Sequence, residues 1–95
     1  MTFEWDEQKR AMNIRKHGID FEDAKAVFEG YTITMDDPGD YGEAQFISTG
    51  MVRLHVMIVI HTERKGNIRI ISARKATKNE QKAYFAHIPD GLGPA

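Results

Sequence analysis

The apolar run between Val52 and His61 constrains the fold of this chain more than any other feature. Apolar and polar residues alternate along it, which is typical of a β-strand because successive side chains point to opposite faces. The polar face also contains Met57 and Val59, so both faces are largely apolar. We therefore expect a central strand, covered by helices on one side and by a partner chain on the other. Its core face would carry Val52, Leu54, Val56, Ile58 and Ile60, and its opposite face Arg53, His55, Met57, Val59 and His61.

Four further strands are expected around this run. Alternation marks residues 3–5 and 31–35, and a third strand is plausible at about 44–49, joined to the central strand by a tight connection near Gly50. Lys65, Gly66 and Asn67 predict a hairpin turn into a last, isoleucine-rich strand at about 68–74. Hairpin connections of this kind predict a mainly antiparallel sheet of about four to five strands.

Capping residues predict two N-terminal helices and one C-terminal helix. Their expected starts and ends are Asp6 to about Lys16, Asp20 to Gly30, and Thr77 to about Ala86, with Gly18 ending the first and Glu80 completing a capping box in the third. The class is α+β, and the length of 95 residues fits one domain at residues 1–88. Pro and Gly then predict a flexible tail at residues 89–95.

Charge is divided along the chain. Residues 61–82 hold seven of the thirteen Lys and Arg residues and carry a net +5, whereas residues 20–43 carry a net −7, although the whole chain is at −1. The basic stretch could face a polyanion and the acidic stretch a cationic partner. There is no cysteine and no long apolar segment of the kind found in signal peptides or membrane spans, so we expect a cytoplasmic protein.

The basic stretch can be interpreted as a phosphate-binding surface or simply as a solvated face. Arg64 lies at the hairpin, Arg74 and Lys75 end a strand, and Lys78 and Lys82 are one turn apart on the last helix. Simple alternation places Arg74 with Ile68 and Ile70, and Arg69 with Lys75 on the other face. The two sets would face the same solvent only if the strand bulges.

Cleavage of RNA without a metal ion needs a proton acceptor, a proton donor and cations around the phosphate. Candidates for the titrating groups are His17, His61, Glu63, Glu80 and Tyr84. A role as a helix cap explains His17 equally well, and packing explains Tyr84. His61 is expected on the outward face of its strand. Lys9, Asn13 and Lys16 form a polar stripe on the first helix that could touch phosphates or merely face water, and the second is expected. The four histidines lack the spacing of a metal site, and no Gly-rich phosphate loop occurs.

Two segments together resemble a known family. They read FEWDEQKRAMNIRKHGIDFEDA at residues 3–24 and HTERKGNIRIISARKATKNEQKAY at residues 61–84. In order and spacing, these segments and the strand between them resemble the BrnT toxins of bacterial type II toxin–antitoxin systems. The resemblance covers nearly the whole chain as far as Tyr84.

This resemblance implies a RelE-like fold and a metal-independent endoribonuclease that needs no cofactor and inhibits growth. It implies a BrnA-like antitoxin, a heterotetramer of two toxins and two antitoxins, and contact with operator DNA through the antitoxin. The site residues that it implies are Lys16, His17, Arg64, Arg74, Lys75, Glu80 and Tyr84. Arg64 and Arg74 would stabilise transition-state charge, and the base stays open among His17, Glu80 and Tyr84.

One position departs from the family pattern. Many relatives carry an arginine two residues after the loop glutamate, whereas this chain has Gln45 after Glu43 and Ala44. If that arginine contacts RNA, the activity of this chain is weaker or altered. Two alternatives stay open: a module that binds RNA or a protein without cleavage, and a degenerate toxin that acts by sequestering its antitoxin and tuning operator binding. A basic antitoxin segment is the expected partner of residues 20–43.

Overall fold

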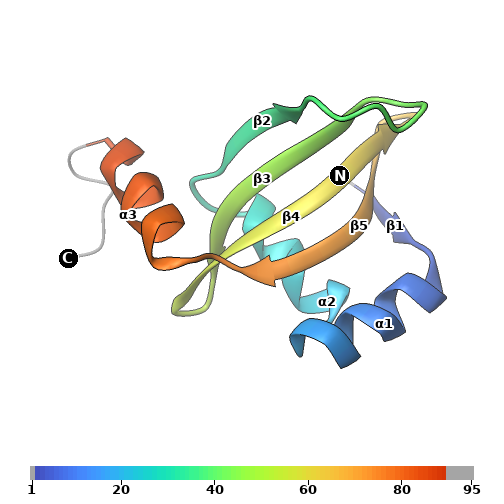
Figure 1. The fold of residues 1–95 in the computed structure, drawn as a ribbon, viewed down its shortest axis with the longest axis horizontal. Helices are drawn as coiled ribbons and strands as arrows, with labels where there is room; N and C mark the ends of the chain where they lie inside the picture. The colour runs from blue at the N-terminus through green and yellow to red at the C-terminus, as the bar shows by residue number, and fades with distance from the viewer. Residues whose placement is uncertain (1, 90–95) are drawn as a thin grey trace.

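The computed structural model describes residues 2–89, and these form one five-stranded mixed sheet with three helices, an α+β fold (Figure 1). The strands are β1 (Thr2–Trp5), β2 (Ile33–Asp37), β3 (Gln45–Val52), β4 (His55–Arg64) and β5 (Asn67–Lys75). The helical segments are α1 (Glu7–His17), α2 (Phe21–Ala24), the 3-10 turn η1 (Lys25–Phe28) and α3 (Lys78–His87). Apart from Pro89, the predicted tail lies outside the described residues.

The strand order is β1-β5-β4-β3-β2, so the apolar run at β4 is the middle strand, as predicted. Three of the four pairings are antiparallel, and β1 pairs with β5 in parallel. The sheet is therefore mixed rather than purely antiparallel. The parallel pair arises because β1 reaches β5 through the helices and three other strands instead of a hairpin.

Two apolar clusters cover the two faces of this sheet. One lies between the sheet and the segments α1, α2 and η1 and includes Phe21, Val27 and Val59. The other lies beneath α3 and includes Ile58 and Tyr84. Figure 1 shows α3 against one end of the sheet, on the side away from α1 and α2. Part of that second face is therefore left without a covering helix.

The connection between β3 and β4 is not where it was predicted. β3 continues through Gly50 to Val52, and the turn falls at Arg53, which has a φ of 55°, and Leu54. Leu54 is 89% exposed, so its assignment to the core is wrong. Gly50 marks a close approach of backbones instead, because a Cβ atom there would lie 2.6 Å from the carbonyl oxygen of Val27 in η1.

The expected exposure of His61 is also wrong. Its side chain is only 2% exposed and lies between the rings of Phe28 and Phe46, with ring centroids 5.0 and 5.7 Å away. Its Nε2 atom is 2.7 Å from the Ser48 hydroxyl, which lies 2.8 Å from the hydroxyl of Thr34. Burial lowers the pKa of His61 below its ordinary value. The face of β4 expected to point outward therefore lies against the N-terminal helical segments, and His61 is a polar residue within that core.

The first predicted helix is confirmed, but its polar stripe is confirmed only at Lys9 and Lys16, which are exposed. Asp6 caps α1, accepting hydrogen bonds from the next turn, and Gly18 ends the helix at a φ of 71°. Asn13, expected to face water, is 5% exposed. It donates to the carbonyl oxygens of Ile19 and Ala73 and accepts from the amide of Ala73. Asn13 therefore fixes α1 to β5.

The second predicted helix, from Asp20 to Gly30, is not confirmed as one helix. Asp20 does cap it, but α2 is a single turn that continues into the 3-10 turn η1. The chain tightens there where Val27 contacts β3 at Gly50. None of the helices within residues 2–89 has the length and apolar character needed to cross a membrane.

Candidate active site

The seven predicted site residues lie in three separate places. Lys16 and His17 are at the end of α1, Arg74, Glu80 and Tyr84 are between β5 and α3, and Arg64 is at the β4–β5 hairpin. Lys75 ends β5 and is exposed. The strand register separates Arg64 from Arg74, since they pair with Asn67 and Ile58 at opposite ends of the hairpin. Six residues along a strand correspond to roughly 20 Å.

A bulge in β5 decides which arginines share a face. Ile60 pairs with Ser72 and His61 pairs with Ile70, so Ile71 has no partner on β4. Ile70 and Ala73 both face the helix-covered core. Arg69 and Arg74 consequently lie on the α3 side and Lys75 on the other, which corrects the faces expected from simple alternation.

Arg74 and Glu80 form a bidentate ion pair. The guanidinium nitrogens of Arg74 donate to the two carboxylate oxygens of Glu80 at 2.8 and 2.9 Å. Glu80 also accepts from the Thr77 amide, which completes the predicted capping box of α3. The Arg74 contact, together with this amide, lowers the pKa of Glu80 to about 2. Glu80 is therefore a weak proton acceptor with a structural role.

Tyr84 has a structural role as well. Its side chain is 3% exposed and its hydroxyl donates to the carbonyl oxygen of Tyr31 at 2.7 Å. Burial raises the pKa of Tyr84 above its ordinary value. The hydroxyl of Tyr84 therefore neither reaches solvent nor ionises readily.

Arg64 is paired at the sheet's other end. Its guanidinium donates to both carboxylate oxygens of Glu43 at 3.1 and 3.3 Å, and both side chains are largely exposed. Gln45, the position where the family pattern has an arginine, begins β3 two residues after Glu43. Arg64 thus lies near Gln45, the position that departs from the family pattern, and away from Lys16 and His17.

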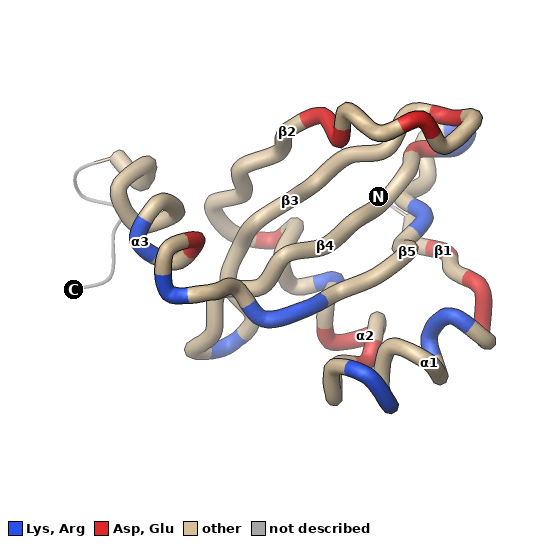
Figure 2. The backbone as a smooth tube through the Cα atoms, viewed as in Figure 1, with Lys and Arg blue, Asp and Glu red and all other residues tan. Residues whose placement is uncertain are grey.

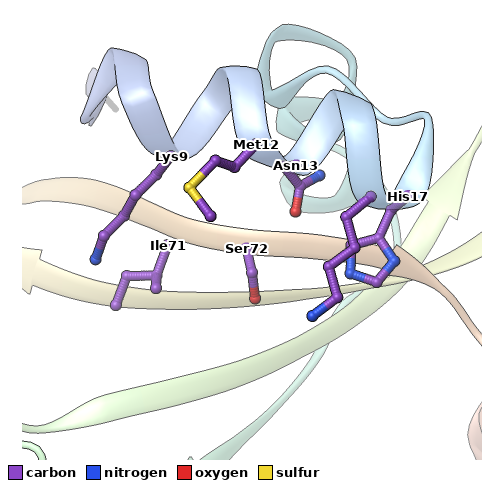
Figure 3. Close-up of a pocket in the computed structure, with 7 residues that line it drawn as sticks. Lys9, Met12, Asn13, His17, Ile71 and Ser72 are labelled. Carbon is purple, nitrogen blue, oxygen red and sulfur yellow. The ribbon is translucent and has the colours of Figure 1, made fainter.

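A pocket of about 280 Å³ lies where α1 passes the free edge of β5 (Figure 3). This edge is free because β1 pairs with β5 only as far as Ile70. In Figure 3, Lys9 and His17 extend from the two ends of α1 toward the strand, on either side of Ser72. The lining residues are Lys9, Met12, Asn13, Lys16, His17, Ile71 and Ser72.

The lysines of this pocket form no ion pair with any described residue. Within residues 2–89, the ion pairs involve Arg10, Lys25, Arg64, Arg69 and Arg74, and neither Lys9 nor Lys16. The side chain of His17 is likewise exposed and makes no hydrogen bond within that range. Lys9 was not among the predicted site residues. The spacing of Lys9 and Lys16, seven residues apart on one helix face, was the signal that could have found it.

Charge is only partly segregated in space, because Arg64 pairs with Glu43 of the acidic stretch. Figure 2 shows Lys and Arg along the end of β5 and on α3, and Asp and Glu at the end of β2 and in the following loop. In the described part of the chain, no three His, Asp or Glu side chains are grouped closely enough to bind a metal ion. The chemistry that these side chains can provide is cationic binding of phosphate and proton transfer by histidine.

The mixed sheet, with a pocket lined by lysine and histidine side chains between α1 and β5, defines a small α+β protein. The chain belongs to the BrnT family, the ribonuclease toxins of type II toxin–antitoxin systems, whose family model matches residues 5–80. It is also similar to the crystal structure of the Brucella abortus ribonuclease toxin BrnT, with 30% sequence identity and a TM-score of 0.65. That match covers 82% of this chain and 99% of the other. No curated protein matches.

Membership of this family confirms the resemblance seen in the sequence. It makes this chain a ribonuclease toxin, and a toxin of a type II system has a cognate antitoxin as its partner.

Proposed function

We propose that this protein is a cytoplasmic, metal-independent endoribonuclease that cleaves RNA in the pocket between α1 and β5. One observation carries this proposal. Of the three residues that the sequence leaves open as the base, Glu80 is bound to Arg74 and Tyr84 is buried, whereas His17 is exposed beside two lysines. Histidine is the side chain most often used for proton transfer in catalysis, because its imidazole can both accept and return a proton.

In this proposal the neutral imidazole of His17 accepts the proton of the ribose 2′-hydroxyl. The 2′ oxygen then attacks the adjacent phosphorus, and the bond from phosphorus to the 5′ oxygen breaks. The leaving oxygen takes a proton from solvent, which gives a 2′,3′-cyclic phosphate and a 5′-hydroxyl end. Lys9 and Lys16 stabilise the negative charge that accumulates on the phosphate oxygens.

Arg74 and Lys75, two other predicted site residues, have supporting roles in RNA binding in this proposal. Arg74 follows Ser72 of the pocket by two residues, so both side chains lie on the same face of β5. Arg74 can bind the next phosphate along the strand, and Lys75 adds charge at the same end of β5. Arg64 lies outside the pocket, and we propose that it contacts RNA beyond the cleaved bond or only fixes Glu43.

We also propose the partners that the family resemblance implies. A BrnA-like antitoxin would form a heterotetramer with the toxin, with two copies of each protein. The antitoxin would bind operator DNA on behalf of the complex. Release of the toxin would then expose its pocket to RNA and inhibit growth.

The test is cleavage of purified RNA in excess EDTA by four variants. His17→Ala and Lys16→Ala should each lower the rate by about a hundredfold or more, since each removes a group used in the transition state. Lys82→Ala, an exposed lysine on α3, is the matched control and should cleave normally. Tyr84→Phe should also retain activity, because its hydroxyl serves Tyr31.

Three results would contradict the proposal. Full activity of His17→Ala would exclude His17 as the base, and loss of activity in Tyr84→Phe without unfolding would restore Tyr84. RNA that is bound by the wild-type protein but stays intact, with or without metal ions, would favour a binding module over a nuclease.

A further inference from the structure

We infer that the free edge of β2 and the apolar groove beside it form the antitoxin-binding surface. The occupant would be an extended antitoxin segment that adds a strand to the sheet and alternates apolar with basic side chains. This inference rests on the antitoxin partner that family membership implies and does not depend on the proposed cleavage pocket.

The first observation is the open strand edge. Within the described residues β2 is the last strand of the sheet and pairs only with β3. Its three central residues, Thr34, Met35 and Asp36, are exposed. In an antiparallel strand, every second residue directs its backbone N–H and C=O groups away from the neighbouring strand. An edge of this kind is a template for an added strand.

The second observation is the groove next to this edge, on the sheet face that α3 leaves partly uncovered. It has a volume of about 310 Å³, and apolar side chains from β2, β3, β4 and α3 dominate its lining. Met35 lies at its outer side and is 62% exposed, the most exposed apolar side chain of the sheet outside its turns. The full lining is Ile33, Met35, Ile47, Thr49, Ile58, Ile60, Arg74, Glu80, Ala83, Tyr84 and His87.

The alternation of side chains along β2 determines which residues an added strand would contact on each face of the sheet. Ile33, Met35 and Asp37 pair with Thr49, Ile47 and Gln45, so they share the groove face. Thr34 and Asp36 point to the opposite face. Alternate side chains of an added strand would therefore lie beside Met35 on one face and beside Asp36 on the other.

The third observation is charge, which identifies the occupant. Of the eight acids in residues 20–43, three are neutralised within the chain, by ion pairs of Asp20, Glu22 and Glu43 with Arg10, Lys25 and Arg64. Asp36, Asp37 and Asp40 at the end of β2 form no ion pair within residues 2–89. Asp37 accepts only from the Gly39 amide and the Tyr41 hydroxyl. The free acids at the end of β2 and in the loop after it therefore favour a segment that carries Lys or Arg.

The first test measures binding of the purified antitoxin encoded beside this chain, by titration calorimetry. Met35→Asp should weaken binding by about tenfold or more, because it places a charge against an apolar partner side chain. Leu54→Asp is the matched control: Leu54 is 89% exposed in the β3–β4 turn and does not line the groove. It should leave the affinity unchanged. Equal affinities for the two variants would overturn the inference.

The second test separates charge from apolar contact. Asp36→Lys should weaken antitoxin binding by about fivefold at low salt and by less at high salt, because salt screens the contact. Glu29→Lys, an exposed acid next to η1, serves as the charge-matched control and should bind normally. The same loss in both variants, or no loss in either, would count against a basic segment at β2.

The third test concerns strand addition itself. Hydrogen exchange should show protection of backbone amides in β2 when the antitoxin binds, and unprotected β2 amides in the complex would overturn the inference. Light scattering of the toxin alone identifies the competing occupant. A dimer that Met35→Asp dissociates, with antitoxin affinity unchanged, would assign the groove to a second copy. RNA cleavage in each variant reports on the pocket separately, so the two proposals can fail independently.

Discussion

At the scale of single residues, the chain uses similar side chains for unrelated purposes. From the sequence, His17 and His61 were both candidates for proton transfer. In the structure, His17 lines an exposed pocket, whereas His61 is 2% exposed in the core. The Nε2 atom of His61 has the Ser48 hydroxyl as its partner, whereas its Nδ1 atom has none within the described residues. Adding a proton to this buried ring is therefore unfavourable.

This burial predicts how stability changes with pH. Since the pKa of His61 is lowered by folding, the unfolded chain binds a proton first as the pH falls. The free energy of unfolding should be highest above about pH 6.5, the ordinary pKa of a histidine, and should fall as the pH is lowered through and below that value. Urea unfolding at several pH values measures this change.

The matched variants for that experiment are two histidine substitutions. His61→Gln should flatten the pH dependence even if it lowers stability overall, whereas His55→Gln, at an exposed position, should preserve it. An equally steep dependence without His61 would assign the effect to another group.

At the scale of elements, close contacts between backbones set the geometry that the site uses. η1 approaches β3 at Gly50, and Asn13 ties α1 to β5 at Ala73. The second contact holds Lys9, Lys16 and His17 beside the free edge of β5. Because α1 is fixed in this way, Lys9 and Lys16 line one pocket beside β5 although both side chains are exposed.

The contact at Gly50 gives a stability prediction. Gly50→Ala places a Cβ atom 2.6 Å from the Val27 carbonyl oxygen, a backbone atom that cannot move without η1. We expect destabilisation of about 1–3 kcal/mol, as for overpacking in a core. Gly30→Ala is the control, because a Cβ atom there meets nothing within 4 Å. Thermal unfolding compares the two, and equal midpoints would show that η1 can move away.

At the scale of the whole molecule, the small net charge conceals two oppositely charged regions. The basic end of β5 lies apart from the acidic end of β2 (Figure 2). We propose that RNA and the antitoxin approach these two regions separately, each attracted by opposite charge.

Binding of RNA should therefore depend on salt. With Lys9, Lys16, Arg74 and Lys75 each neutralising a phosphate, the logarithm of the affinity should fall with the logarithm of salt concentration at a slope of about −3. Lys75→Ala should make this slope shallower by about 0.7. A 2′-O-methyl RNA, which lacks the attacking hydroxyl, permits the measurement without cleavage. A slope that Lys75→Ala leaves unchanged would remove this lysine from the RNA path.

Much of the fold could be predicted because its signals are local. The caps at Asp6, Asp20 and Thr77, the glycine at 18 and the hairpin at Gly66 each act within a few residues, and the structure confirms them. The family could be identified from the sequence for a related reason, since its motifs are long and continuous. Features that depend on a distant partner were harder to predict.

The sequence by itself determined the central strand, the α+β class, the family and the separation of charge, because these follow from periodicity, capping and composition. Only the tertiary structure decided which polar residues are available for chemistry. It buried His61 and Asn13, paired Arg74 with Glu80, and placed Arg69 and Arg74 on one face through the bulge at Ile71. Burial, pairing and strand register depend on residues far apart in the chain, and no local pattern records them.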